Sequence, residues 1–120
     1  MPFVVVRVNT AMTTEQELGL KAQLGQAIGL VPGKSEEYLL VDVENRCHLF
    51  LVGDGQTPLA YLEASVFGNE GHAGYAAFTR AVTQSLHDVL GIAPDHAYLR
   101  FSDIGAWGVS GQYIDRRMFG

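Results

Sequence analysis

The two halves of the chain carry the same order of signals, and this repetition limits the fold more than any other feature. Each half opens with a proline and an apolar run, continues with apolar residues at helical spacing, and reaches a Gly-x-x-Pro stretch. The starting prolines are Pro2 and Pro58, and the Gly-x-x-Pro stretches lie at 29–32 and 91–94. Because β-α-β crossovers are right-handed, two such units put both helices on one face of one sheet. We therefore expect an α/β chain, a two-layer α+β sandwich with a four-stranded mixed sheet, two helices on one face and short edge strands.

Periodicity places the individual elements. The first helix is expected over residues 14–30, beginning with a capping box at residues 14–17, and the second carries its apolar stripe from Tyr75 to Leu90. An irregular segment or a short hairpin is expected after residue 103. Strands are expected at 2–8, 38–44, 47–52, 58–67 and 97–101, with 38–44 and 47–52 joined as a hairpin.

A length of 120 residues suits one domain, which we place at 1–120, with repeats at about 2–52 and 58–102 and a tail at 103–120. Two helices cover one sheet face and leave the other bare. The runs 2–8 and 38–43 are apolar on both sides, so the bare face needs cover. A homo-oligomer that packs its sheets inward is the simplest solution.

Charge and cysteine content exclude several classes of function. The net charge is −5, and the largest basic cluster is Arg116-Arg117, which argues against nucleic-acid and membrane partners. The single Cys47 forms no internal disulfide, and no export signal is visible, so we expect a cytoplasmic protein. The four histidines lack ligand spacing and no phosphate-binding glycine motif follows a strand, so we expect no metal and no nucleotide cofactor.

Pro2 is the residue that most suggests chemistry. A small residue after the initiator normally permits removal of Met1, which would leave the proline nitrogen as a secondary amine at the chain end. Enclosure or a neighbouring cation lowers the pKa of a terminal amine, which then acts as a neutral base near pH 7. The alternative is that Pro2 simply begins a strand, where its missing N–H costs nothing.

In its order of motifs the whole chain resembles the macrophage migration inhibitory factor (MIF) family of the tautomerase superfamily, in its bacterial type. The resemblance rests on residues 1–3, 28–36, 65–68, 91–95 with Tyr98, and Trp107-Gly108. It implies a duplicated β-α-β protomer, a homotrimer with sites at subunit interfaces, and cofactor-independent keto-enol tautomerisation of 2-oxo acids such as phenylpyruvate. It also leaves non-classical secretion open.

The resemblance assigns roles to one residue at the chain start, one in the loop after the first helix and one at the end of the strand 58–67. Pro2 matches the catalytic base. Lys34 matches a pocket lysine suited to a substrate carboxylate, although a lysine in such a loop is otherwise a solvated charge. Phe67 falls where the family presents a backbone N–H to substrate, while its ring fits a core position equally well.

Further substrate-binding candidates lie toward the C-terminus. Tyr98 matches a tyrosine contributed by the adjacent subunit, and Arg100 either holds a carboxylate or fills an interface ion pair. Trp107 matches an aromatic wall, Val109 replaces a second aromatic, and Phe119 takes the place of a terminal phenylalanine.

The chain also departs from the family in ways that keep a second function open. Its tail continues through residues 112–120, where Tyr113, Ile114 and Met118 are other candidates for the pocket mouth. Residues 69–74 lack the arginines that the superfamily's dehalogenase and decarboxylase branches use, which disfavours hydration chemistry. The alternative to an enzyme is therefore a non-catalytic, cytokine-like interaction protein with a vestigial pocket.

Overall fold

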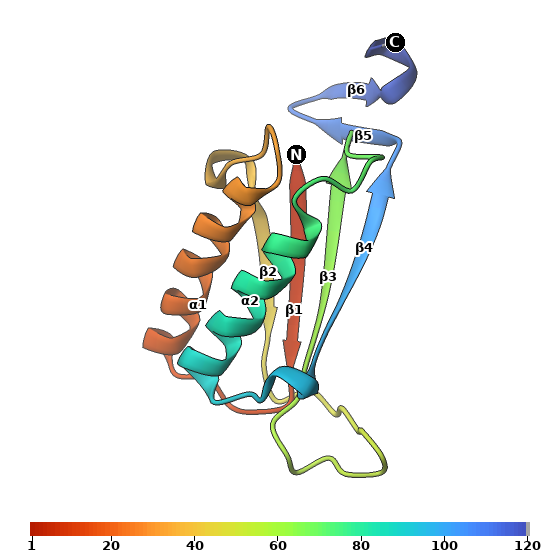
Figure 1. The fold of residues 1–120 in the computed structure, drawn as a ribbon. Coiled ribbons are helices and arrows are strands. Elements are labelled where there is room, and N and C mark those ends of the chain that lie inside the picture. Colours follow the sequence, from red (N-terminus) through yellow and green to blue (C-terminus); the bar gives the residue numbers. More distant parts are fainter. Residues whose placement is uncertain (120) are drawn as a thin grey trace.

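The computed structural model describes residues 1–119 and contains the expected four-stranded mixed sheet (Figure 1). The strands β1 (Pro2–Val8), β2 (Leu40–Glu44), β3 (Ala60–Phe67) and β4 (Ala97–Ile104) lie in the order β2-β1-β3-β4. Each half supplies a parallel pair, β1 with β2 and β3 with β4, and the antiparallel β1–β3 pair joins the halves. The tandem β-α-β prediction is confirmed.

Two helices, α1 (Thr14–Ala27) and α2 (Tyr75–Leu90), cover the same face of this sheet (Figure 1). The capping box of α1 lies one residue earlier than predicted, because Thr13 is its N-cap. The Thr13 hydroxyl accepts from the Gln16 N–H at 3.1 Å, and the Gln16 side chain accepts from the Thr13 N–H at 2.9 Å. Helix α1 ends at Ala27, and the expected last turn is the 3₁₀ segment η1 (Ile28–Leu30).

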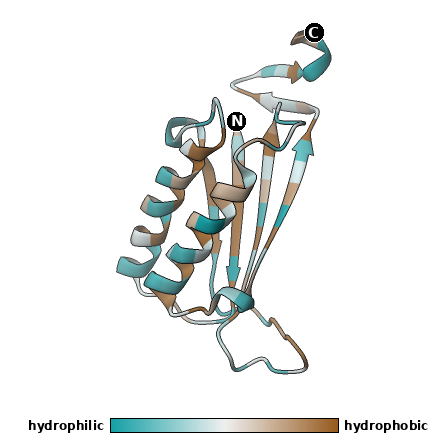
Figure 2. Ribbon diagram, viewed as in Figure 1, coloured by the Kyte–Doolittle hydropathy of each residue, from teal (hydrophilic) through white to brown (hydrophobic). Residues whose placement is uncertain are grey.

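The core fills the space between the helices and the sheet. On β1, alternate residues face the helices and are buried, while the residues between them are partly exposed. Figure 2 shows the apolar stripes of both helices turned toward the strands. The largest side chains with less than 2% exposure are Phe78, Leu20, Leu24, Ile28, Leu62, Leu86 and Ile92.

The uncovered sheet face is less apolar than predicted. Strand β2 alternates, with Val41 and Val43 partly buried while Leu40, Asp42 and Glu44 are exposed. Asp42 makes the uncovered side of the run 38–43 partly polar, so this run is not apolar on both sides. Exposed Leu40 and Tyr98, at 63% and 53%, still leave apolar surface on this face.

Two predicted elements differ from the structure. Residues 47–52 form no strand and carry a single isolated bridge between Leu51 and Asp54, so the predicted hairpin is wrong. The backbone at Cys47 instead bonds to Val8, at the end of β1. Residues 36–38 form the 3₁₀ segment η2 (Glu36–Tyr38), so β2 starts two residues later than predicted.

The C-terminal segment lies beyond the end of the sheet where β3 and β4 finish and β1 begins (Figure 1). It consists of β5 (Ala106–Val109), β6 (Gln112–Asp115) and the single turn η4 (Arg116–Phe119). The remaining short turn, η3 (Pro94–His96), leads into β4 at the opposite end. Within residues 1–119, no helix has the length and apolar character needed to cross a membrane. The chain start and the C-terminal segment lie at the same end of the sheet (Figure 1).

Candidate functional site

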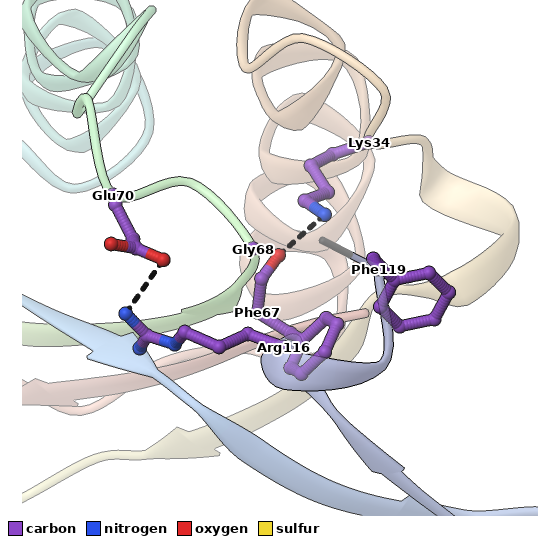
Figure 3. Close-up of a pocket in the computed structure, with 6 residues that line it drawn as sticks. All are labelled: Lys34, Phe67, Gly68, Glu70, Arg116 and Phe119. Atoms are coloured by element: carbon purple, nitrogen blue, oxygen red, sulfur yellow. Dashed lines mark hydrogen bonds and ion pairs between the residues drawn. The ribbon is translucent and has the colours of Figure 1, made fainter.

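An open cavity of about 420 Å³ lies at the end of the sheet where the N-terminus and the tail meet. Its walls come from three places: the loop after η1, the end of β3 with the loop that follows, and the turn η4 (Figure 3). Two of its lining residues are cationic and two are aromatic. The lining residues are Lys34, Phe67, Gly68, Glu70, Arg116 and Phe119.

Strand register brings the start of the chain to this cavity. Pro2 pairs with Val66, so Met1 lies beside Phe67, whose N–H donates a 3.4 Å hydrogen bond to the Met1 carbonyl. Pro2 itself is buried and is not among the lining residues. The chain end thus borders the cavity through the Phe67 backbone.

Lys34 brings a positive charge to the same point. Its Nζ donates a 2.7 Å hydrogen bond to the Phe67 carbonyl oxygen (Figure 3). Partial burial of the Met1 amino group, and then the charge of Lys34 and a hydrogen bond with it, lower the pKa of that group from 8.0 to about 6. The Met1 amino group is therefore mostly neutral at pH 7.

Aromatic rings form another side of the cavity. Phe67 is 8% exposed, and the edge-to-face contact between its ring and that of Phe119 has a centroid separation of 6.3 Å. Phe119, the aromatic residue predicted to contribute from the tail, belongs to η4. The structure places its ring against that of Phe67, in the same cavity as Lys34. The cavity can hold an apolar group next to a cation.

Three lining residues were not predicted from the sequence: Gly68 and the charged pair Glu70 and Arg116. Arg116 forms ion pairs with Glu70 at 2.8 Å and with Asp103 at 3.2 Å. Residues 69–74 contain no arginine, but the guanidinium of Arg116 reaches this loop from the tail. The sequence shows Arg116-Arg117 as its largest basic cluster, but nothing in it indicates that Arg116 forms ion pairs with Glu70 and Asp103.

The structure does not bring Tyr98 or Arg100 to this cavity within one protomer. Tyr98 pairs with Tyr61, six residues before Phe67 on β3, which corresponds to about 20 Å along the strand. Arg100 lies on the same uncovered face, 4.0 Å from Glu63. The prediction that Tyr98 serves a neighbouring subunit's site stays a prediction.

The remaining tail candidates also lie outside the lining set. Trp107 pairs with Ile114, and Val109 pairs with Gln112, across the β5–β6 hairpin. Tyr113 donates to Asp115, whose carboxylate also accepts from Arg117. The Arg117 and Tyr113 hydrogen bonds hold the pKa of the Asp115 carboxyl well below its usual range. These bonds join β6 to η4, and no candidate among Tyr113, Ile114 and Met118 lines the cavity.

The described part of the chain brings together no group of three histidine, cysteine, aspartate or glutamate side chains that could hold a metal ion. The groups at the cavity are a terminal amine, a lysine, a backbone N–H and aromatic rings. Together they can place a carboxylate beside a neutral base.

Known proteins match most of the length of this chain. A family model described as macrophage migration inhibitory factor matches residues 1–113. The macrophage migration inhibitory factor of Meriones unguiculatus is 28% identical over 109 residues, which cover 91% of this chain and 93% of that protein.

Solved structures show the same fold. The MIF2 structure of Leishmania major has a TM-score of 0.87 at 18% identity and covers 95% of this chain and 97% of its own. A protein named Pt0534, inactivated by 2-oxo-3-pentynoate, has a TM-score of 0.83 at 16% identity and covers 98% and 99%. A fused 4-OT asymmetric trimer has a TM-score of 0.80 at 19% identity and covers 98% of both chains.

Proposed function

The chain belongs to the macrophage migration inhibitory factor family, and from this premise we propose that it is a cofactor-independent tautomerase of 2-oxo acids such as phenylpyruvate. The proposed base is the Pro2 nitrogen, exposed by removal of Met1. The observation that carries the proposal is the place of the chain start, where the 2.7 Å contact of Lys34 with Phe67 and the pairing of Pro2 with Val66 bring a cation beside the N-terminus; there burial and Lys34 lower the pKa of the Met1 amino group to about 6. A general base is most effective when its pKa lies near the working pH.

The reaction needs one group that accepts and returns a proton. The neutral Pro2 nitrogen removes a proton from the carbon next to the ketone, and the electron pair moves to the ketone oxygen. The protonated Pro2 nitrogen then returns the proton to the enolate oxygen, which gives the enol and leaves the amine neutral again. Neither an oxidant nor a cofactor enters this balance.

Lys34 and Phe67 are proposed to bind the substrate. Lys34 now donates to a neutral carbonyl, so its charge is available to a substrate carboxylate at the cavity. The Phe67 N–H now donates to the Met1 carbonyl. Removal of Met1 takes that acceptor away, which frees the N–H for a substrate oxygen without moving β3.

Assembly into a homotrimer is part of the proposal. The uncovered sheet face carries exposed Tyr98 and Leu40, and a structural neighbour is described as a trimer. In such an assembly Tyr98 of one subunit would complete the cavity of the next. A site shared between subunits accounts for the distance of Tyr98 from Phe67 within one chain.

Mass spectrometry of the intact protein is the first test, because a retained Met1 leaves no free proline nitrogen. Initial rates with phenylpyruvate are then measured for the wild type, Pro2→Gly and the matched control Pro58→Gly. Pro58 starts the second repeat and has no free amine, so its variant should keep the wild-type rate.

We expect Pro2→Gly to lose at least about a hundredfold in kcat/KM, the typical contribution of a general base. As an independent readout, 2-oxo-3-pentynoate, an electrophilic 2-oxo acid, should add to the Pro2 nitrogen and raise the mass of the N-terminal peptide. Equal rates for wild type and Pro2→Gly, with no labelling, would favour the non-catalytic interaction protein.

A further inference from the structure

Arg116 joins three segments that are far apart in the sequence. It belongs to η4, and its guanidinium binds Glu70, in the loop between β3 and α2, and Asp103, on β4. Its backbone N–H also donates to the Gly105 carbonyl at 2.9 Å. Figure 3 shows the Arg116 side chain extending toward Glu70.

The turn η4 needs such an anchor. Four residues form one helical turn, which is marginal without tertiary contacts. Phe119, at the end of this turn, is 73% exposed and touches the ring of Phe67. The position of the Phe119 ring therefore depends on what holds the turn in place.

Arg117, the neighbouring arginine, does not provide this link. Its guanidinium binds Asp115, two residues earlier in the same segment, and its side chain is 85% exposed. This contact stabilises the tail internally and ties it to neither β4 nor the loop after β3.

Arg116 is also unsuited to bind a substrate anion directly. Two carboxylates already bind its guanidinium, whereas Lys34 faces a neutral carbonyl oxygen. A third carboxylate at Arg116 would meet the negative charges of Glu70 and Asp103. The two cations of the cavity thus have different tasks.

We propose that Arg116 is a positioning residue that holds Phe119 as an aromatic wall of the cavity and thereby sets the preference for aromatic over small 2-oxo acids. The substrate preference rests on the proposed tautomerase function, whereas the anchoring of the tail does not.

The test compares Arg116→Gln with two further variants. Gly105→Ala keeps the charge but displaces the guanidinium, because an added Cβ would lie 2.9 Å from its Nε and Nη2 atoms. Arg80→Gln, an exposed change on α2, is the control for loss of one positive charge.

In Arg116→Gln and Gly105→Ala, we expect the KM for phenylpyruvate to rise about threefold to tenfold, as loss of a partly exposed ion-pair network allows. The KM for pyruvate, which has no ring to pack, and kcat for both substrates should change less than about twofold. Arg116→Lys should restore part of the lost affinity, and Arg80→Gln should behave as wild type. An equal rise in KM for both substrates would show a direct carboxylate contact and overturn the proposal.

Hydrogen exchange of the amides at 105–119 gives a readout that needs no activity. These amides should exchange faster in Arg116→Gln than in Arg80→Gln, while the core strands stay protected. Unchanged exchange would overturn the anchoring role even in an active enzyme. Faster exchange in a protein without tautomerase activity would support the anchor and reject the proposed function instead.

Discussion

The Nζ of Lys34 and the carbonyl oxygen of Phe67 lie 2.7 Å apart, and this contact joins residues 33 positions apart in the sequence. It fixes the loop after the first helix to the last residue of β3. The Phe67 N–H meets the chain end on the other side of the same residue. One residue of β3 therefore aligns the cation and the amine.

The first prediction follows from this contact. Replacing Lys34 with Gln removes the charge proposed to bind the substrate carboxylate, and a hydrogen bond to a charged group contributes about 1.5 to 3 kcal/mol. We expect the KM for phenylpyruvate to rise about tenfold to a hundredfold. Lys34→Arg, which keeps the charge, should lose less. A Lys34→Gln variant with the wild-type KM would place the carboxylate elsewhere.

The second prediction concerns pH. Burial and Lys34 lower the pKa of the Met1 amino group from 8.0 to about 6, and we expect the same two causes to lower the pKa of the Pro2 nitrogen, one residue further along, once Met1 is removed. Because the base is the neutral form, kcat/KM should rise as the pH increases through a pKa below that of an ordinary terminal amine and level off below pH 8. In Lys34→Gln one cause of the lowered pKa is lost, so the rise should move to higher pH. A wild-type profile whose rise falls at pH 8 or above would contradict this reading.

The parts of the fold that the sequence predicts are those with local signals. The β-α-β repeat follows from the apolar periodicity and from Gly91, which takes the left-handed conformation at the end of α2 with φ 69°. The prediction of a strand at 47–52 was wrong. Its apolar residues have high strand propensity, but Phe50 is 72% exposed and pairs with no strand of this protomer.

The candidate site could be predicted only in part. Family resemblance brings together Pro2, Lys34 and Phe67, and the strand register then places them at one end of the sheet. The Arg116 contacts with Glu70 and Asp103 form only because the tail after β4 folds back toward β4 and the loop after β3. Local propensity carries no information on such a long-range ion pair.

The third prediction tests the core. Phe78 is 1% exposed and meets the ring of Phe101 edge-to-face at 6.0 Å. Phe78→Ala should lower the free energy of unfolding by about 3 to 5 kcal/mol, because it leaves a cavity between α2 and the sheet. Leu18→Ala, at a residue 58% exposed, should change it by less than about 0.5 kcal/mol. Urea denaturation at one fixed protein concentration measures both, and similar losses would contradict this packing.

The fourth prediction tests whether Tyr98 serves a neighbouring subunit. Tyr98 lies about 20 Å along β3 from the cavity of its own chain, so a site that uses it must take it from another copy. Pro2→Gly and Tyr98→Ala should each be weakly active alone, since each assembly lacks one of the two groups at every site.

Mixed assemblies of the two variants show whether Tyr98 serves the site of a neighbouring subunit. When the two variants are coexpressed in equal amounts and assemble at random, about one quarter of the sites combine an intact Pro2 with an intact Tyr98 from the next subunit. We expect about that fraction of wild-type activity, well above the average of the two separate variants. Activity equal to that average would mean that each chain builds its site alone, and it would remove Tyr98 from the site, because its own cavity is out of reach.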